Sequence, residues 1–444
     1  MHRRTFTRLG ATTIAGLAIP RAVTGLSNGP RWPSDLRVNG ARLNDRMGRL
    51  ARFGANAAGG IDRVAFSDAD LAGRDWVMGL MREAGLSVSV DLAGNILGRR
   101  EGSRADLPPL WLGSHIDSVP GGGNYDGQVG TMAALEVAWT LADAGEATRY
   151  PLDFVVFTNE EGGKTGSRAL VGEVEARELD LPTASGFTIG EGIRRIGGDP
   201  ERLGEAQREA GSLTAFLELH IEQGAVLHTD GFQIGVVEGI VGIRRWNVTV
   251  TGAANHAGTT PMDRRQDAMV AAARFVDTVH RTARELAGRH VATVGRLEAE
   301  PGAPNVIPGK VTLSLEIRDL SMEGIDAVFD AITARAPNIA QETGTTFSYD
   351  RFYVSGAAPT DLRIRDLVES SAGGLGLSTL RMPSGAGHDA QSIAHLAPVG
   401  MIFVPSVAGI SHSPEEHTAP DDVTRGADVL LQTLLGLDAG ALDG

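Results

Sequence analysis

The stretch LWLGSHIDSVPGGGNYDGQVG, residues 110–130, joins an apolar strand-like run to a glycine-rich loop. It begins with an apolar run, after which one His and two acids stand among six glycines. Glycine suits a backbone that bends sharply or that another group approaches closely. Imidazole and carboxylate groups are ligands of zinc-like cations. His115, Asp117 and Asp126 therefore raise the hypothesis of a metal site at the end of a strand.

A crossover helix is expected directly after this stretch. The segment GTMAALEVAWTLADAG, residues 130–145, has helical apolar spacing and closes with a glycine. It would connect the apolar strands at 110–112 and 152–158, each of which ends at a cluster of polar residues. Strands that alternate with helices in this way predict an α/β domain over residues 34–234. In open sheets of this class, ligands gather at the carboxyl ends of the strands.

A second unit is predicted to interrupt this domain. Residues 235–350 would form a small antiparallel sheet backed by two helices, and residues 351–444 would return to the first pattern. The supporting segments are alternating strands at 234–252, an amphipathic helix at 263–288, two strands around a turn at 290–319 and a helix at 322–336.

Composition limits the partners of the chain. With 444 residues it exceeds the roughly 250–300 residues of a single core, so two domains are expected. A formal charge of −14 without a basic stripe argues against nucleic acid and against an anionic membrane. There is no Cys, so any metal must be held by His and carboxylate groups.

The N-terminal segment MHRRTFTRLGATTIAGLAIPRA, residues 1–22, resembles a twin-arginine export signal. Residues 1–33 are accordingly expected to form a signal and a flexible N-terminus, which predicts a periplasmic or exported protein. The alternative is a disordered basic tail on a cytoplasmic protein, because the apolar stretch is weak and no clean cleavage site follows it.

Four clusters hold the residues that could carry chemistry. Taken singly, each has an ordinary explanation: His220 could be a core histidine, and Glu160 with Glu161 a solvated acidic turn. Taken together, paired carboxylates at a strand end are costly unless cations neutralise them. A dinuclear site needs one bridging carboxylate and about two further ligands per metal. The clusters supply that number: His115, Asp117 and Asp126; Glu160 and Glu161; His220; and His412.

Nine motifs then occur in a fixed order: HIDSVP, GGxYDG, NEEG, HIEQG, NHAGTTPM, PNVIPG, EIRD, SGAGHDA and SHSPEE. In this order they resemble the hydantoinase/carbamoylase branch of the dinuclear-zinc aminoacylase and carboxypeptidase family, over about residues 36–435. The resemblance implies a zinc-peptidase-like α/β catalytic domain with an inserted α+β domain for closure and dimerisation.

The resemblance also implies roles for the clustered residues. Asp126 would bridge two metal ions, His115 and His220 would complete one site, and Glu161 and His412 the other. Asp117 would orient the His115 imidazole through its other nitrogen. Glu160 would be the general base, which takes a proton from the metal-bridging water and passes it to the leaving nitrogen. Zinc is the expected metal, although such ligands also accept manganese, cobalt or nickel.

A different set is implied in the inserted domain, where residues face the substrate partly across a homodimer interface. His256 would donate to the oxyanion of the intermediate, and Arg318 would grip a substrate carboxylate with two parallel bonds. Without the family, Asn305 could be a turn residue and Arg318 a strand-surface charge. The further candidates for contacts to the ureido group are Gln223 and His388.

We therefore expect a metal-dependent amidohydrolase that cleaves the ureido bond of N-carbamoyl L-amino acids and acts on a small carboxylate substrate. Allantoate is the next expectation, and ureidoglycolate or a carbamoyl β-amino acid would suit the same ligands. A peptidase is disfavoured by the forms HIEQG and NHAGTTPM. The non-enzymatic alternative is an exported solute-binding protein, which leaves the His and Glu clusters unexplained.

Overall fold

The computed structural model describes residues 35–443, and the export signal predicted at residues 1–33 lies outside this range. Within residues 35–443, no helix is both long and apolar enough to cross a membrane.

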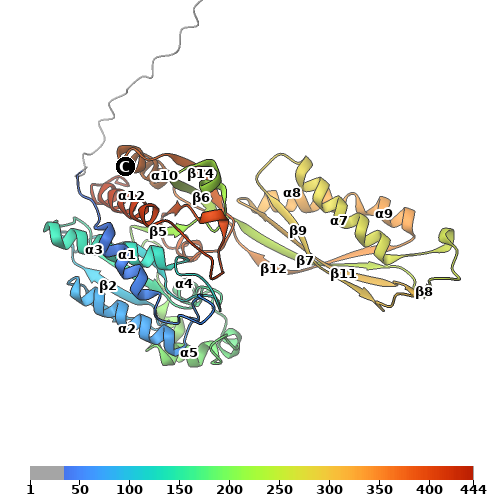
Figure 1. Cartoon of the computed structure of the whole chain (residues 1–444), viewed down its shortest axis with the longest axis horizontal. Coiled ribbons are helices and arrows are strands. Elements are labelled where there is room, and N and C mark those ends of the chain that lie inside the picture. The colour runs from blue at the N-terminus through green and yellow to red at the C-terminus, as the bar shows by residue number, and fades with distance from the viewer. Residues whose placement is uncertain (1–34, 444) are drawn as a thin grey trace, which may run out of the picture. The chain divides into compact units, whose positions relative to one another are not determined.

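A nine-stranded mixed sheet organises the larger domain (Figure 1). Its order is β1-β2-β4-β3-β5-β15-β6-β13, with β14 paired to β6. The parallel pairs β3–β4, β3–β5 and β5–β15 form its centre. The strands are β1 Ser87–Val90, β2 Ile96–Arg100, β3 Leu110–His115, β4 Leu152–Phe157, β5 Ala215–Ile221, β6 Ile234–Ile240, β13 Ala358–Pro359, β14 Thr379–Ser384 and β15 Val399–Val404.

Both faces of this sheet are covered, which explains why its central strands are apolar runs. On β3, Leu110 and Leu112 face one hydrophobic core while Trp111 faces the other. The first core is shared with α1 Gly40–Leu50, α2 Asp68–Glu83, α3 Gln128–Ala144, α10 Leu362–Gly374 and α12 Pro420–Asp438. Shorter helices lie elsewhere in this domain: α4 Thr165–Leu170, α5 Ile189–Arg195, α6 Val226–Asp230, α11 Asp389–Ile393 and the 3₁₀ turns Ala176–Asp180, Pro200–Ala206 and Val407–Gly409.

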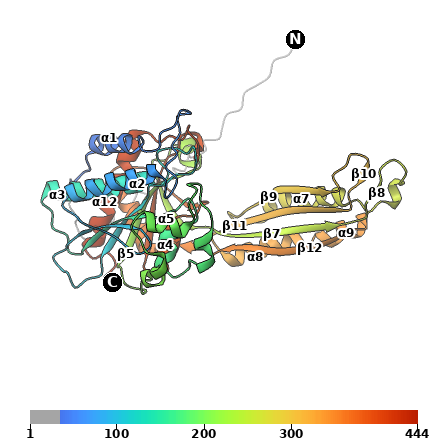
Figure 2. The same ribbon diagram turned by 90° about the horizontal axis from the view of Figure 1, so that it is seen from below.

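The smaller sheet has four antiparallel strands in the order β12-β7-β11-β9. Its strands are β7 Gly242–Thr251, β9 Val291–Glu300, β11 Lys310–Asp319 and β12 Thr346–Ser355. Alternate residues of β11, such as Leu313 and Leu315, are fully buried and pack in one core with Phe275 of α7. Figure 2 shows α7 alongside these strands. The predicted fold class, an α/β domain with a separate small antiparallel unit, is confirmed.

Three helices back the small sheet, where two were expected. They are α7 Ala268–Glu285, α8 Met322–Thr333 and α9 Ala336–Thr343. The additional helix begins where the predicted helix at 322–336 ends, and Pro337 lies in its first turn. Proline fits the first turn of a helix but not its interior, so the chain starts a new helix there.

The chain also crosses between the two sheets at positions slightly different from those expected. Strand β6, which was predicted to open the inserted unit at residue 235, pairs with β14 and β15 in the large sheet. The chain passes to the small sheet at Val241 and returns after Ser355, whereas residue 350 was expected. The alternating pattern over 234–252 does not reveal this division, because both strands are half-apolar and only pairing partners separate them.

Candidate metal centre and substrate-binding residues

The candidate ligands come from five segments that meet at one edge of the large sheet. His115 is the last residue of β3, Glu161 follows β4, His220 lies on β5 and His412 follows β15. Asp126 precedes α3. The carboxyl ends of parallel neighbours lie at the same sheet edge, so residues up to about 300 positions apart are brought together.

The glycines of the 110–130 stretch allow Asp126 to fold back toward His115. Gly127 has φ +73°, a conformation that residues with a Cβ rarely adopt. A Cβ at this position would collide with the imidazole ring of His115. Gly127 is therefore required by both its backbone conformation and the close approach of the ring.

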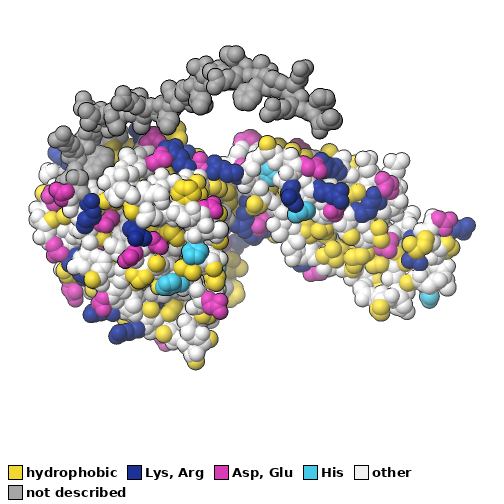
Figure 3. Space-filling view, turned by 45° about the horizontal axis from the view of Figure 1, so that its top comes forward, with side chains coloured by type: hydrophobic (Ala, Val, Ile, Leu, Met, Phe, Trp, Pro, Cys, Tyr) yellow, Lys and Arg dark blue, Asp and Glu magenta, His cyan; other side chains and the backbone are white. Residues whose placement is uncertain are grey.

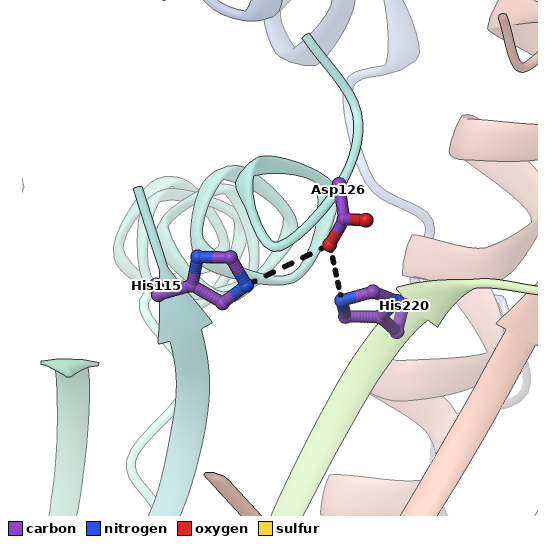
Figure 4. A group of neighbouring side chains, drawn as sticks. All are labelled: His115, Asp126 and His220. Atoms are coloured by element: carbon purple, nitrogen blue, oxygen red, sulfur yellow. Dashed lines mark ion pairs between the residues drawn. The ribbon is translucent and has the colours of Figure 1, made fainter. Parts of the chain in front are cut away.

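Asp126 lies between two groups of ligands. Its Oδ1 is 3.1 Å from Nε2 of His220 and 3.7 Å from Nε2 of His115 (Figure 4). Its Oδ2 is 3.3 Å from Nε2 of His412, which is in turn 3.4 Å from Oε1 of Glu161. Each carboxylate oxygen thus faces a different group, which is the arrangement that a bridging carboxylate requires. Both groups have the donor types and proximity of a divalent cation site.

Burial makes the charge of this cluster costly without a cation. Burial and the nearby Asp126 raise the pKa of Glu161 to about 8. Burial opposes the charge of His220, but Asp126 outweighs it and raises the pKa of His220 to about 9. His115, where burial dominates, has its pKa lowered to about 4 and is neutral, as a ligand must be. Divalent cations would neutralise the excess of carboxylates.

The opening of the cluster is at His412, whose side chain is 48% exposed. The side chains of the other four candidate ligands are at most 12% exposed. His412 is therefore the most solvent-accessible of the five candidate ligands.

Glu160 lies beside the ligands without belonging to either group. Its Oε2 is 3.9 Å from Nε2 of His115. Burial, Asp389 and Glu161 together raise the pKa of Glu160 well above its usual range. Such a carboxyl can accept and hold a proton near neutral pH, which a general base must do.

Asp117 contacts the site with both its backbone oxygen and its carboxylate, whereas only an orienting contact to His115 was expected. Its backbone oxygen is 3.0 Å from Nδ1 of His115, whereas its carboxylate Oδ1 is 3.7 Å from that nitrogen. The carboxylate instead accepts the backbone N–H groups of Glu160 at 3.3 Å and Glu161 at 3.2 Å. Asp117 therefore holds both the His115 ring and the loop that carries the two glutamates.

Glu416 is a structural partner of the site that the sequence reasoning missed. Its buried carboxylate accepts the backbone N–H of Tyr125 at 2.9 Å and of Asp126 at 3.1 Å, and that of His412 at 3.3 Å. It also accepts the hydroxyl of Ser411 at 2.9 Å. Glu416 thus joins the two loops that carry Asp126 and His412. The second Glu of the SHSPEE motif was the available signal.

Gln223 and His388 take different positions around the cluster. The side-chain amide of Gln223 donates to Oδ2 of Asp126, while its buried Oε1 has no hydrogen-bond partner among residues 35–443. The ring of His388 packs against that of His220 at 4.4 Å between centroids, and its Nε2 is 2.7 Å from Oγ of Ser384. Gln223 therefore offers an acceptor beside Asp126, whereas His388 is buried against His220.

Arg318 and His256 lie at opposite ends of the small sheet. The pairing register places Arg318 opposite Ile243 at the end that connects to β6, and Lys310 opposite Thr251 at the other end. His256 follows that far end in β8, Asn255–His256, which is seen at the tip of the sheet in Figure 1. A ten-residue strand spans about 30 Å. Arg318 and His256 are separated by roughly that length.

Asn305 lies beside His256 at this far end. The strand β10, Val306–Ile307, pairs with β8, and the backbone oxygen of Asn305 accepts the N–H of Ala257 at 3.0 Å. The 3₁₀ turn Met262–Arg264 follows in the same loop. At the near end, Arg318 donates from Nε to Glu316 at 2.8 Å and from Nη1 to the backbone oxygen of Gly385 at 2.6 Å.

Comparison with known proteins agrees with this architecture. The sequence profile of peptidase family M20/M25/M40 matches residues 111–436. The N-carbamoyl-L-amino acid amidohydrolase of Geobacillus stearothermophilus is 40% identical over 408 residues, which cover 91% of this chain and 100% of that protein. The allantoate deiminase of Arabidopsis thaliana is 33% identical over 429 residues, which cover 88% of this chain and 82% of that protein.

A solved structure shows the same likeness. The crystal structure of a hydantoinase/carbamoylase family amidase from Burkholderia multivorans has a TM-score of 0.84 and 37% identity, covering 91% of this chain and 98% of that one. The chain therefore belongs to peptidase family M20/M25/M40, and within it to the hydantoinase/carbamoylase branch. The predicted family is confirmed, and the chain is a hydrolase acting on carbon–nitrogen bonds. The family assignment supports the enzyme over the alternative of an exported solute-binding protein.

Proposed function

We propose that this protein hydrolyses the ureido bond of N-carbamoyl L-amino acids with two divalent metal ions, giving ammonia, carbon dioxide and the free amino acid. The observation that carries the proposal is the position of Asp126. One of its oxygens faces His115 and His220 and the other faces His412, which lies beside Glu161. Two curated relatives that are 40% identical to this chain are N-carbamoyl-L-amino acid amidohydrolases.

The donor set suits zinc, with manganese, cobalt or nickel as alternatives, because it contains imidazole and carboxylate but no thiolate. When bound, such ions polarise a carbonyl group and lower the pKa of water. The ligands would be His115, His220 and Asp126 for one ion, and Asp126, Glu161 and His412 for the other.

Residues of the chain itself would orient the substrate and move the proton. Glu160, whose raised pKa lets it hold a proton near neutral pH, would accept one from water and deliver it to the leaving nitrogen. The unpartnered Oε1 of Gln223 would accept an N–H of the ureido group. Arg318 would bind the substrate carboxylate with its planar fork, exchanging its present hydrogen bonds to Glu316 and Gly385 for two carboxylate oxygens.

His256 would donate a hydrogen bond to the carbonyl oxygen of the substrate. Its Nδ1 accepts the backbone N–H groups of Gly258 at 3.0 Å and Thr259 at 3.1 Å. Because Nδ1 is an acceptor, the proton of the neutral ring resides on Nε2, which is then available as a donor. Such a donor stabilises negative charge that develops on oxygen in the transition state.

We further propose that His256 and Asn305 serve the site of a second copy of the chain. The support is their place at the far end of a sheet about 30 Å long, away from the strands that connect to the metal cluster. The small-sheet region also carries exposed hydrophobic side chains, including Val291, Leu297 and Val270. In Figure 3, hydrophobic side chains gather on the face of this region that is in view. Such patches favour association.

The test is hydrolysis of a panel of substrates by purified protein, with the metal content measured by elemental analysis. N-carbamoyl L-amino acids, allantoate, ureidoglycolate and β-ureidopropionate would each be assayed after chelation and reloading with zinc, manganese, cobalt or nickel. We expect two ions per subunit and the highest kcat/KM on an N-carbamoyl L-amino acid. A higher kcat/KM on allantoate would overturn the substrate, and a metal-free active enzyme would overturn the metal centre.

The twin-arginine segment leads to a separate proposal, that the protein is exported in its folded, metal-loaded form. Arg3 and Arg4 followed by an apolar stretch support it. Replacement of both arginines by lysine should retain the protein in the cytoplasm, as measured by cell fractionation. An unchanged distribution of the variant would contradict export by this route.

A further inference from the structure

A cavity of about 650 Å³ adjoins the candidate metal centre, between the end of β14 and the start of α6. Gln223 and Arg318 both line it. The amide of Gln223 contacts Asp126, and Arg318 is the proposed carboxylate anchor. A substrate held at these two residues by its ureido and carboxylate groups therefore has this cavity available for its third substituent.

One part of the cavity wall is apolar. It includes Leu380, Met382 and Pro383 from the β14 segment, and Val226 from the first position of α6. Met382 belongs to the hydrophobic core between the sheet and α11, and Leu380 packs against the same core. Val226 is 45% exposed, so its side chain leaves apolar surface uncovered at this place. These four side chains belong to the larger domain.

The charged groups that line the cavity already have partners. Arg289 pairs with Glu238 at 2.5 Å. Arg381 pairs with Asp366 at 2.6 Å, on α10. The carboxylate of Glu222 accepts the backbone N–H groups at the start of α6, both at 2.8 Å. A charged or strongly polar substituent would find no unpaired ionic partner among these groups and would lose its hydration.

We propose that this cavity, which we call the β14 cavity, is the subsite for the side chain of the N-carbamoyl amino acid and selects a bulky apolar side chain. The inference rests on the proposed function, because the ureido and carboxylate groups define where the side chain begins. A pocket of this volume is within the size range of small-molecule sites and accommodates a leucine- or phenylalanine-sized group. Allantoate carries a second ureido group, and its polar atoms would lose hydration against these apolar side chains without gaining hydrogen bonds.

The first test compares substrates that differ only in this side chain. Each buried methylene contributes about fourfold to binding. The kcat/KM of the wild-type enzyme should then be on the order of 10²-fold higher for N-carbamoyl-L-leucine than for N-carbamoylglycine, and low for N-carbamoyl-L-aspartate. Equal values for leucine and glycine derivatives would overturn the subsite but leave the proposed function intact. No hydrolysis of any carbamoyl derivative would overturn the proposed function itself.

The second test fills the cavity. Val226→Trp should reduce kcat/KM for the leucine derivative at least about tenfold and leave that for the glycine derivative within about threefold, because only the larger substrate needs the space. Leu362→Trp is the matched control, since Leu362 is 64% exposed at the start of α10 and does not line the cavity. Equal losses on both substrates in Val226→Trp would contradict the inference.

The third test changes the chemistry of the wall. Leu380→Asp places a carboxylate in the cavity without added bulk. It should lower kcat/KM for the leucine derivative and raise the relative kcat/KM for N-carbamoyl-L-lysine by about tenfold or more, because the new charge pairs with the substrate ammonium. An unchanged ratio of the two values, in protein with normal activity on the glycine derivative, would place the side chain elsewhere.

Discussion

The candidate metal ligands and His256 of the small-sheet region differ in how far they are buried and in what fixes their side chains. Four of the five candidate ligands are largely buried, and Asp126 contacts His115, His220 and His412, the last of which contacts Glu161. His256, by contrast, is exposed at the far end of the small sheet, where the backbone N–H groups of Gly258 and Thr259 hold its ring. The candidate metal ligands thus come together when one chain folds, whereas His256, the proposed oxyanion donor, would reach a metal cluster only by the proposed dimerisation.

The largest expected effect on activity is at Glu160, in the buried metal cluster. Glu160→Gln should retain both metals and lose about 10²–10⁴-fold in kcat, because the amide cannot accept a proton. Glu161→Gln should instead lose metal from one site. Metal content and kcat measured on both variants separate the two roles. Retention of more than about a tenth of wild-type kcat in Glu160→Gln would exclude it as the base.

A smaller effect is expected at the near end of the small sheet. Arg318→Lys keeps the charge but removes the fork, and should lower kcat/KM roughly 10²-fold, as for about 3 kcal/mol of transition-state binding. Selectivity against a substrate with an amidated carboxylate should largely disappear in this variant. The carboxylate anchor would be refuted by a wild-type enzyme that hydrolyses the amidated analogue as fast as the acid.

Mixing of inactive variants tests whether His256 serves the site of a second subunit. His256→Ala and Glu160→Gln proteins should each be nearly inactive, whereas an equal mixture should regain about a quarter of wild-type activity. Half of the dimers are then mixed, and one of their two sites carries both intact residues. Glu160→Gln mixed with Glu161→Gln is the control. Both defects lie in the metal cluster of their own chain, so every cluster of a mixed dimer carries one of them and no activity should return. Failure to recover after proven subunit exchange would contradict the dimeric site.

The smallest effect is on stability and concerns only the metal cluster. In metal-free protein the pKa of Glu161 is raised from 4.5 to about 8, so its contribution to the free energy of unfolding is complete below pH 4.5 and is lost as the pH rises through about 8. His412, with a pKa raised to about 9, acts in the same direction above pH 6.5. The Tm of chelated protein should therefore fall by a few degrees between about pH 6 and pH 8.5.

Reloading with metal should remove this fall, because the ions neutralise the ionised carboxylates. Calorimetry of chelated and reloaded protein at both pH values makes the comparison. A Tm of the chelated protein that stays constant or rises with pH would show that the cluster carries no excess negative charge.

Some features could be predicted from single segments. The helix after the glycine stretch was expected because apolar spacing and a terminal glycine are local properties, and α3 ends at Gly145 in the left-handed conformation. The alternation on β11 likewise placed Leu313, Leu315 and Ile317 on the buried face and Arg318 on the other. The sheet that contains β6 could not be predicted in this way, because strand pairing is a property of distant partners.

The sequence by itself determined the ligand types, their order and the family, because these depend on residue identity and spacing. Tertiary structure alone decided that the two oxygens of Asp126 face different ligand groups, and that Glu416 joins the loops of Asp126 and His412. It also decided that the β14 cavity borders Gln223 and Arg318, which are 95 residues apart in the chain. The physical reason is that distances between side chains arise from the packing of the sheet edges, and no local pattern of the chain encodes them.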